Sequence, residues 1–111
     1  MASLQECEQA LHVLADRLAA TDPARRTAGF DRTLSCTIRD LHVVFGGRLH
    51  DGLLLDIARV DAATGQITLD LTGDDLLALV DGSLNLASAW AGGRVKVSAG
   101  VRDLMKLRSI F

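Results

Sequence analysis

The chain has 111 residues, of which 49% are apolar and 23% charged, so we expect one globular domain with a single core. A net charge of −2 with scattered basic residues argues against a nucleic-acid partner, which needs a cationic surface to neutralise phosphates. No segment reaches the ~20 apolar residues of a membrane span, and the first residues lack a signal-peptide pattern. We therefore expect no stable membrane insertion and a cytoplasmic location.

Residues 3–20 have the pattern of an amphipathic helix. Ser3 followed by Glu6 is a capping box, and Pro23 ends the helix because it disfavours helical backbone at the residue before it. Apolar side chains recur at intervals of three and four along one side: Leu4, Cys7, Leu11, Leu14 and Leu18. We expect this stripe to pack on the rest of the domain; a homodimer seam is the alternative.

Alternating apolar and polar residues then predict four strands, after a turn or short helix at residues 22–29. The strands are expected at residues 33–38, at 43–49, from 53 onwards and at 67–71. Gly46 and Gly47 indicate a bulge or a close backbone approach, and Asp51-Gly52 predicts a hairpin turn. In the third strand we expect Leu53, Leu55 and Ile57 to face one way.

The last third of the chain predicts two short helices, a strand and a terminal helix. Thr72 is expected to cap a helix that carries Asp74 and Asp75 in its first turn and ends at Gly82. Its inner face is expected to be Leu76, Leu77 and Val80. A second helix is predicted at residues 86–91 and a fifth strand at 94–98, and the apolar side of the final helix would hold Val101, Leu104, Met105, Leu107 and Phe111.

These elements predict an α+β fold in a single domain over residues 1–111. The N-terminal helix at residues 3–20 is followed by a sheet and C-terminal helices at about 32–111. Short turns without crossover helices favour a five-stranded, mainly antiparallel sheet that helices cover on one face.

Residues suited to catalysis or metal binding do not form a recognisable pattern. His12, His42 and His50 lack partners at metal-ligand spacing, and we predict no metal, cofactor or catalytic residue. Cys7 and Cys36 are expected to be buried reduced thiols. We therefore predict that the protein is not an enzyme.

The C-terminal third resembles the sterol carrier protein 2 family. The resemblance is carried by residues 73–82 (GDDLLALVDG), 86–90 (LASAW), 93–97 (GRVKV) and 105–107 (MKL). It implies a five-stranded sheet covered on one side by helices, and an apolar tunnel between the two layers. That tunnel would take a sterol, a fatty acid, an acyl-CoA or a phospholipid. The resemblance implies either a carrier that does not transform its lipid or a lipid-binding domain of a larger enzyme.

Two positions depart from the family pattern. Gly92 stands where many relatives have Gln, and Ala91 stands where relatives tend to have a second large aromatic residue. The resemblance therefore implies a pocket that lacks one polar group here and is wider or differently filled.

The predicted function is the binding and transport of an apolar ligand. An apolar helical layer supports it physically, because each buried methylene of a ligand contributes ~0.8 kcal/mol. The residues expected to contact ligand are Leu76, Val80, Leu86, Trp90, Val95, Val97, Leu104, Met105 and Phe111, with Trp90 first because it has a large apolar face and one polar atom. The alternatives are an interaction module that assembles through the N-terminal helix, and an enzyme subunit.

Overall fold

The computed structural model describes residues 2–20, 31–51 and 53–103, which form a five-stranded sheet with helices on one side. In chain order the elements are α1 (Leu4–Ala19), β1 (Asp31–Ile38), η2 (Arg39–Leu41), β2 (Val43–His50), β3 (Leu53–Val60), β4 (Ile67–Leu71), α2 (Gly73–Asp81), α3 (Leu86–Ala91) and β5 (Lys96–Ser98). The predicted α+β class is therefore confirmed. Residues 22–29, for which we predicted a turn or short helix, lie outside the described residues.

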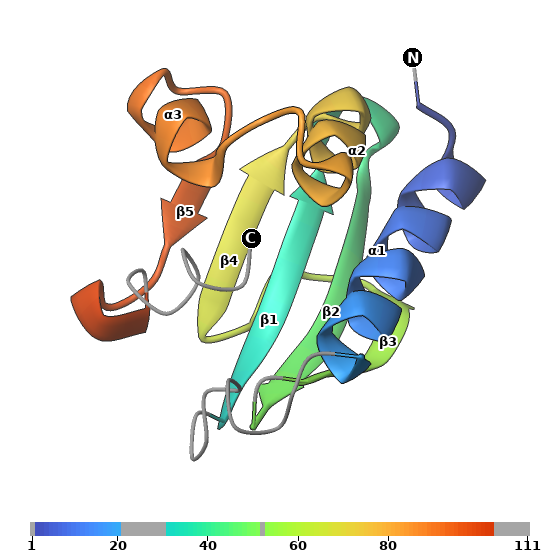
Figure 1. Cartoon of the computed structure of the whole chain (residues 1–111), viewed down its shortest axis with the longest axis vertical. Coiled ribbons are helices and arrows are strands. Elements are labelled where there is room, and N and C mark those ends of the chain that lie inside the picture. The colour runs from blue at the N-terminus through green and yellow to red at the C-terminus, as the bar shows by residue number, and fades with distance from the viewer. Residues whose placement is uncertain (1, 21–30, 52, 104–111) are drawn as a thin grey trace.

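The strand order across the sheet is β3-β2-β1-β4-β5. The pairs β1–β2, β2–β3 and β4–β5 are antiparallel, as expected, but β1 and β4 at the centre are parallel. The β2–β3 hairpin occupies one side of β1, so the returning chain places β4 on the other side. The two edges of the sheet are β3 and β5. Helix α1 packs beside β3, so it lies far from β5 (Figure 1).

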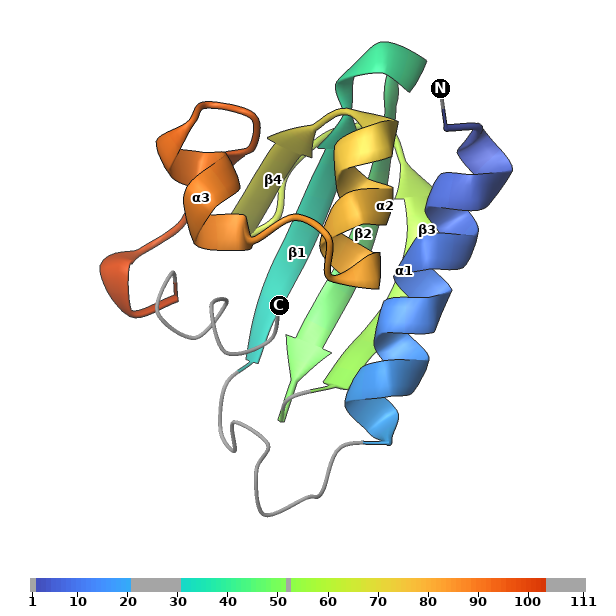
Figure 2. The ribbon, with the colours of Figure 1, turned by 45° about the horizontal axis from the view of Figure 1, so that its top comes forward.

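Helices α1, α2 and α3 lie on the same face of the sheet, with α1 beside β3, α2 over the centre and α3 beside β4 and β5 (Figures 1 and 2). The capping box of α1 is present: Glu6 N donates to Ser3 Oγ at 3.1 Å, and Ser3 N donates to Glu6 Oε1 at 3.0 Å. The apolar stripe of α1 is buried within its own domain, and its buried members are Cys7, Ala10, Leu11, Leu14 and Leu18. This agrees with the expectation that the stripe packs on the rest of the chain.

The prediction that Leu53, Leu55 and Ile57 share one side of β3 is wrong. A bulge shifts the β2–β3 register once, and Asp56 there has a left-handed φ of 56°. Because a bulge adds one residue to the alternation, Leu54 and Ile57 pack toward the core and Leu55 is exposed.

The predicted close approach at Gly46 and Gly47 is confirmed, since this bulge lies opposite them. A Cβ atom on Gly47 would lie 3.1 Å from Leu54 Cδ1, and one on Gly46 would lie 3.1 Å from Val60 Cγ1. Both distances are tight, so a Cβ atom at either position would require the Leu54 or Val60 side chain to shift by a few tenths of an ångström.

The short helices begin and end at side chains suited to those positions. Thr72 Oγ1 accepts from Asp75 N at 3.3 Å, and Asn85 Oδ1 accepts from Ser88 N at 3.2 Å. Gly82, with φ 87°, ends α2 as predicted. The fifth strand is shorter than predicted, and residues 101–103 are helical at the start of the predicted final helix.

The space between α1 and the sheet is filled by side chains. One void there has a volume of about 10 Å³ and lies among Leu11, Leu34, Cys36, Phe45 and Leu54. A void of that size is at the lower limit for a single water molecule, so the region is close-packed. Of the helices that the structure describes, none is both long and apolar enough to cross a membrane.

Candidate functional site

Four of the predicted ligand-contact residues lie together in the interior. Leu76 and Val80 on α2 are 1% and 5% exposed, and Leu86 on α3 is 7% exposed. Val95, in the segment between α3 and β5, is 1% exposed. All four belong to one apolar cluster with the inner residues of β1 and β4, so α2, α3 and the segment before β5 present an aliphatic layer.

The other predicted contact residues differ in position. Val97 on β5 is opposite Leu69 of β4 and is partly buried against the core. Trp90 on α3 is 50% exposed, so half of the indole reaches solvent. Leu104, Met105 and Phe111 lie outside the described residues.

Sequence reasoning missed two members of this layer, Leu79 on α2 and Ala89 on α3, which are 4% and 1% exposed. We had assigned Leu77 to the inner face of α2, but it is only partly buried. The signal was available, because Leu79 follows Leu76 by three residues and a helix brings such positions onto one face.

Charged groups fasten the segment between α3 and β5 to α2 and to the sheet. Arg94 pairs with Asp75, whose side chain is 10% exposed. Arg39 Nη2 donates to the Arg94 carbonyl at 2.8 Å, and Arg39 Nε lies 3.0 Å from Asp70 Oδ1 on β4. Asp75 lies in the first turn of α2, as predicted, and its carboxylate also pairs with Arg94 in the segment that leads into β5.

A groove with a volume of about 560 Å³ runs between the outer sides of α1 and α2. Its apolar lining comes from Ala10, Val13, Leu77 and Val80, and polar side chains lie at its margins. Arg17 Nη1 donates to the Val80 carbonyl at 2.6 Å and so joins the two helices. Val80 is the predicted contact residue that lines this groove.

Burial and hydrogen bonding shift the pKa values of several side chains. Burial raises the pKa of the Cys36 thiol to about 12, and burial also raises the pKa of Cys7. Hydrogen bonds from Arg48 lower the pKa of Asp31, with the two Arg48 nitrogens 2.8 and 2.6 Å from its oxygens. Among the residues that the structure describes, no group of three or more His, Cys, Asp or Glu side chains is arranged to hold a metal ion.

No family model matches the sequence, and no curated protein does. The fold, however, is similar to solved structures along almost its whole length. The palmitated sterol carrier protein 2-like 2 from Aedes aegypti has 17% sequence identity and a TM-score of 0.70, and the match covers 98% of this chain and 94% of that one. The Aedes aegypti sterol carrier protein 2 in complex with palmitate has 22% identity and a TM-score of 0.65, covering 97% and 94%.

A larger protein contains a similar unit. The stereoselective inverting sec-alkylsulfatase from Pseudomonas sp. has 25% identity and a TM-score of 0.68 over 88% of this chain. This chain spans 15% of the length of that sulfatase. Together the comparisons show that the α+β domain described above has the fold of sterol carrier protein 2.

Proposed function

We propose that this protein binds a ligand with a long alkyl or acyl chain and carries it without transforming it. The observation that supports this best is the aliphatic layer formed by α2, α3 and the segment before β5, in a fold that two palmitate-bearing structures share over nearly their full length. Ten buried methylenes would supply ~8 kcal/mol before the cost of ordering the ligand. Such binding needs an apolar volume and few hydrogen bonds.

The ligand would lie between the sheet and the layer of α2 and α3, in contact with Leu76, Leu86 and Val95. Trp90 would mark the rim, because the residue is half exposed and tryptophan combines a large apolar ring with one polar N–H.

A titration of delipidated protein with a polyene fatty acid tests this proposal. Trp90 is the sole tryptophan of the chain, and energy transfer from its indole should rise with ligand and saturate at one ligand per protein. The control is a Trp90→Phe/Leu55→Trp variant, which moves the donor to the exposed side of β3 and should give weaker transfer. Transfer that never saturates, or that is equal from both positions, would argue against a site at α3.

The sulfatase likeness favours a second candidate, an accessory unit that holds the alkyl part of a substrate for a separate enzyme. An alkyl sulfate should then displace the fatty acid from this protein without release of inorganic sulfate. Sulfate release by the purified chain would contradict both candidates. Assembly through the N-terminal helix has less support, because the apolar stripe of α1 is already buried against its own domain.

A further inference from the structure

We propose that the β5 edge of this protein is a docking surface for a membrane that contains anionic lipids. The β5 edge is defined here as residues 86–103, which comprise α3, β5 and the segments that follow each of them. The inference deepens the proposed function, because it says where the protein would meet the membrane that supplies its ligand. It does not depend on an internal pocket.

The first observation is the distribution of charge along the chain. Residues 82–111 contain five basic residues and one acidic residue, whereas residues 1–81 contain seven basic and thirteen acidic residues. A chain with a net charge of −2 therefore has a final section of net charge +4. Such asymmetry between sections is typical of proteins with a separate surface for an anionic partner.

Of the basic residues in this final section, the structure describes Arg94, Lys96 and Arg102, and all three lie in the β5 edge. Arg94 is paired with Asp75, so Lys96 and Arg102 supply the cationic charge of this edge, while many of the carboxylates lie on the other elements.

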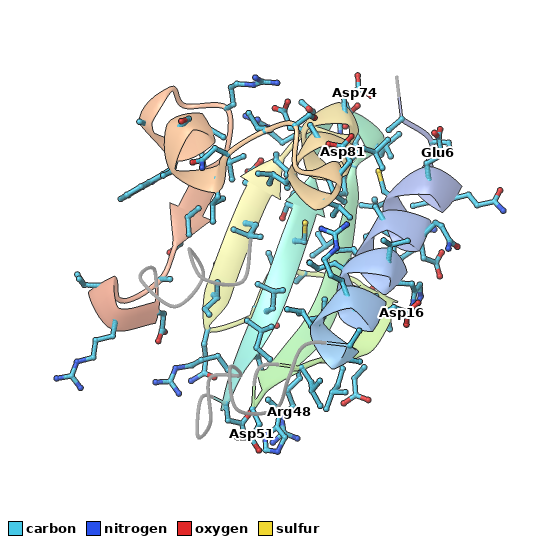
Figure 3. All side chains as sticks on the ribbon, in the orientation of Figure 1. Glu6, Asp16, Arg48, Asp51, Asp74 and Asp81 are labelled. Atoms are coloured by element: carbon cyan, nitrogen blue, oxygen red, sulfur yellow. The ribbon has the colours of Figure 1, made fainter. Side chains whose placement is uncertain are left out.

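The labelled carboxylates Glu6 and Asp16 lie on α1, and Asp74 and Asp81 lie on α2 (Figure 3). Helix α1 contacts β3, which is one edge of the sheet, while β5 is the other edge. An approaching anionic surface would thus be attracted at the β5 edge and repelled at α1.

The second observation is that exposed apolar side chains and exposed cations alternate along the β5 edge. Trp90 is 50% exposed and Val101 is 76% exposed, and the side chains of Lys96 and Arg102 are also exposed. Lys96 is opposite Asp70 in the sheet, but Asp70 is already engaged by Arg39.

These side chains fit a lipid headgroup region. Tryptophan favours the membrane–water interface because its ring is apolar and its N–H needs a polar partner. Lysine and arginine near the surface of an anionic leaflet each strengthen binding. The edge lacks the broad apolar face that would insert into the acyl region, so it suits reversible docking.

Flotation of the full-length, ligand-free protein with vesicles tests the inference. Vesicles of phosphatidylcholine alone are compared with vesicles in which about one third of the lipid is phosphatidylserine. We expect binding to the anionic vesicles only, with a blue shift of Trp90 emission, quenching by brominated acyl chains, and weakening at high salt. Lys96→Gln and Arg102→Gln should each weaken binding about fivefold.

Matched variants separate docking from general electrostatics. Arg59→Gln removes an exposed cation from β3 and should leave binding unchanged, although it changes the net charge by the same amount as Lys96→Gln. Trp90→Ala should weaken binding about tenfold, since it removes the largest exposed apolar side chain of the edge. Leu55→Ala removes an exposed side chain of β3 and should have no effect.

Three results would overturn the inference: equal binding to both vesicle types, equal effects of Arg59→Gln and Lys96→Gln, or binding to soluble polyglutamate without binding to vesicles. Fatty-acid titration of the double variant Lys96→Gln/Arg102→Gln distinguishes failure of the docking inference from failure of the proposed function. Vesicle binding lost with saturable fatty-acid binding retained confirms that docking is separate from the ligand site. Vesicle binding intact in a protein that never binds fatty acid would remove the proposed function alone.

Discussion

Replacing Leu76 with alanine distinguishes a ligand wall from a plain core. Leu76 lies on α2 and is 1% exposed, and the change removes about three methylene equivalents, or about 2.4 kcal/mol of transfer free energy. The cavity left behind adds to this loss, so the free energy of unfolding of the ligand-free protein should fall by about 3 kcal/mol. If Leu76 lines the ligand site, that cavity joins the site and a fatty acid about three carbons longer should bind best.

The assay is urea unfolding of the ligand-free variant, followed by titration with saturated fatty acids of increasing length. Leu14→Ala is the matched control, because Leu14 on α1 is 3% exposed and lies in the close-packed region beside β3. It should destabilise the protein similarly and leave the preferred chain length unchanged. A folded Leu76→Ala protein with an unchanged length preference would refute the assignment of Leu76 to the ligand wall.

Three further predictions concern charged and titratable groups. Arg94→Met should lower the free energy of unfolding by about 2 kcal/mol in urea titration, because it leaves the largely buried Asp75 carboxylate without its cation, and adding Asp75→Asn should recover part of that loss. For Asp31, the pKa is lowered by Arg48, so the pair stabilises the protein above the ordinary Asp pKa and the effect is lost as pH falls through the folded value. Thermal melts of wild type and Asp31→Asn should therefore differ at neutral pH and converge in acid, and a constant difference would contradict this. Burial raises the pKa of Cys36 from 9.0 to about 12, so its thiol ionises at lower pH in the unfolded chain than in the folded protein. The free energy of unfolding should therefore fall by about 1.4 kcal/mol per pH unit between these two values. The Cys36→Ala variant should lack this contribution to the pH dependence.

Local signals in the sequence predicted most of the fold because each has a local physical cause. The capping box at Ser3, the left-handed cap at Gly82 and the alternation in β4 were all confirmed. Pairing between distant strands has no such signal, so the parallel contact of β1 with β4 was not predicted. The phase error in β3 arose because a non-glycine residue, Asp56, adopts the left-handed conformation at the bulge.

The candidate site was predicted in part. Periodicity placed Leu76 and Val95 in the interior, where packing decides the position of aliphatic side chains. Periodicity could not place Trp90, because a six-residue helix at the margin of the sheet leaves its burial to tertiary contacts. The pairing of Arg94 with Asp75 depends on how the segment between α3 and β5 returns to α2, which the sequence does not encode locally.

Native mass spectrometry tests most directly whether this protein holds a lipid. Three samples are compared: gently purified protein, the same protein after delipidation, and delipidated protein to which palmitate has been added. A single added mass of one acyl chain, absent after delipidation and restored in a 1:1 ratio by palmitate, is the expected result. A protein that takes up no palmitate at saturating concentration, while remaining folded, would contradict the proposal that α2, α3 and the sheet enclose a lipid site.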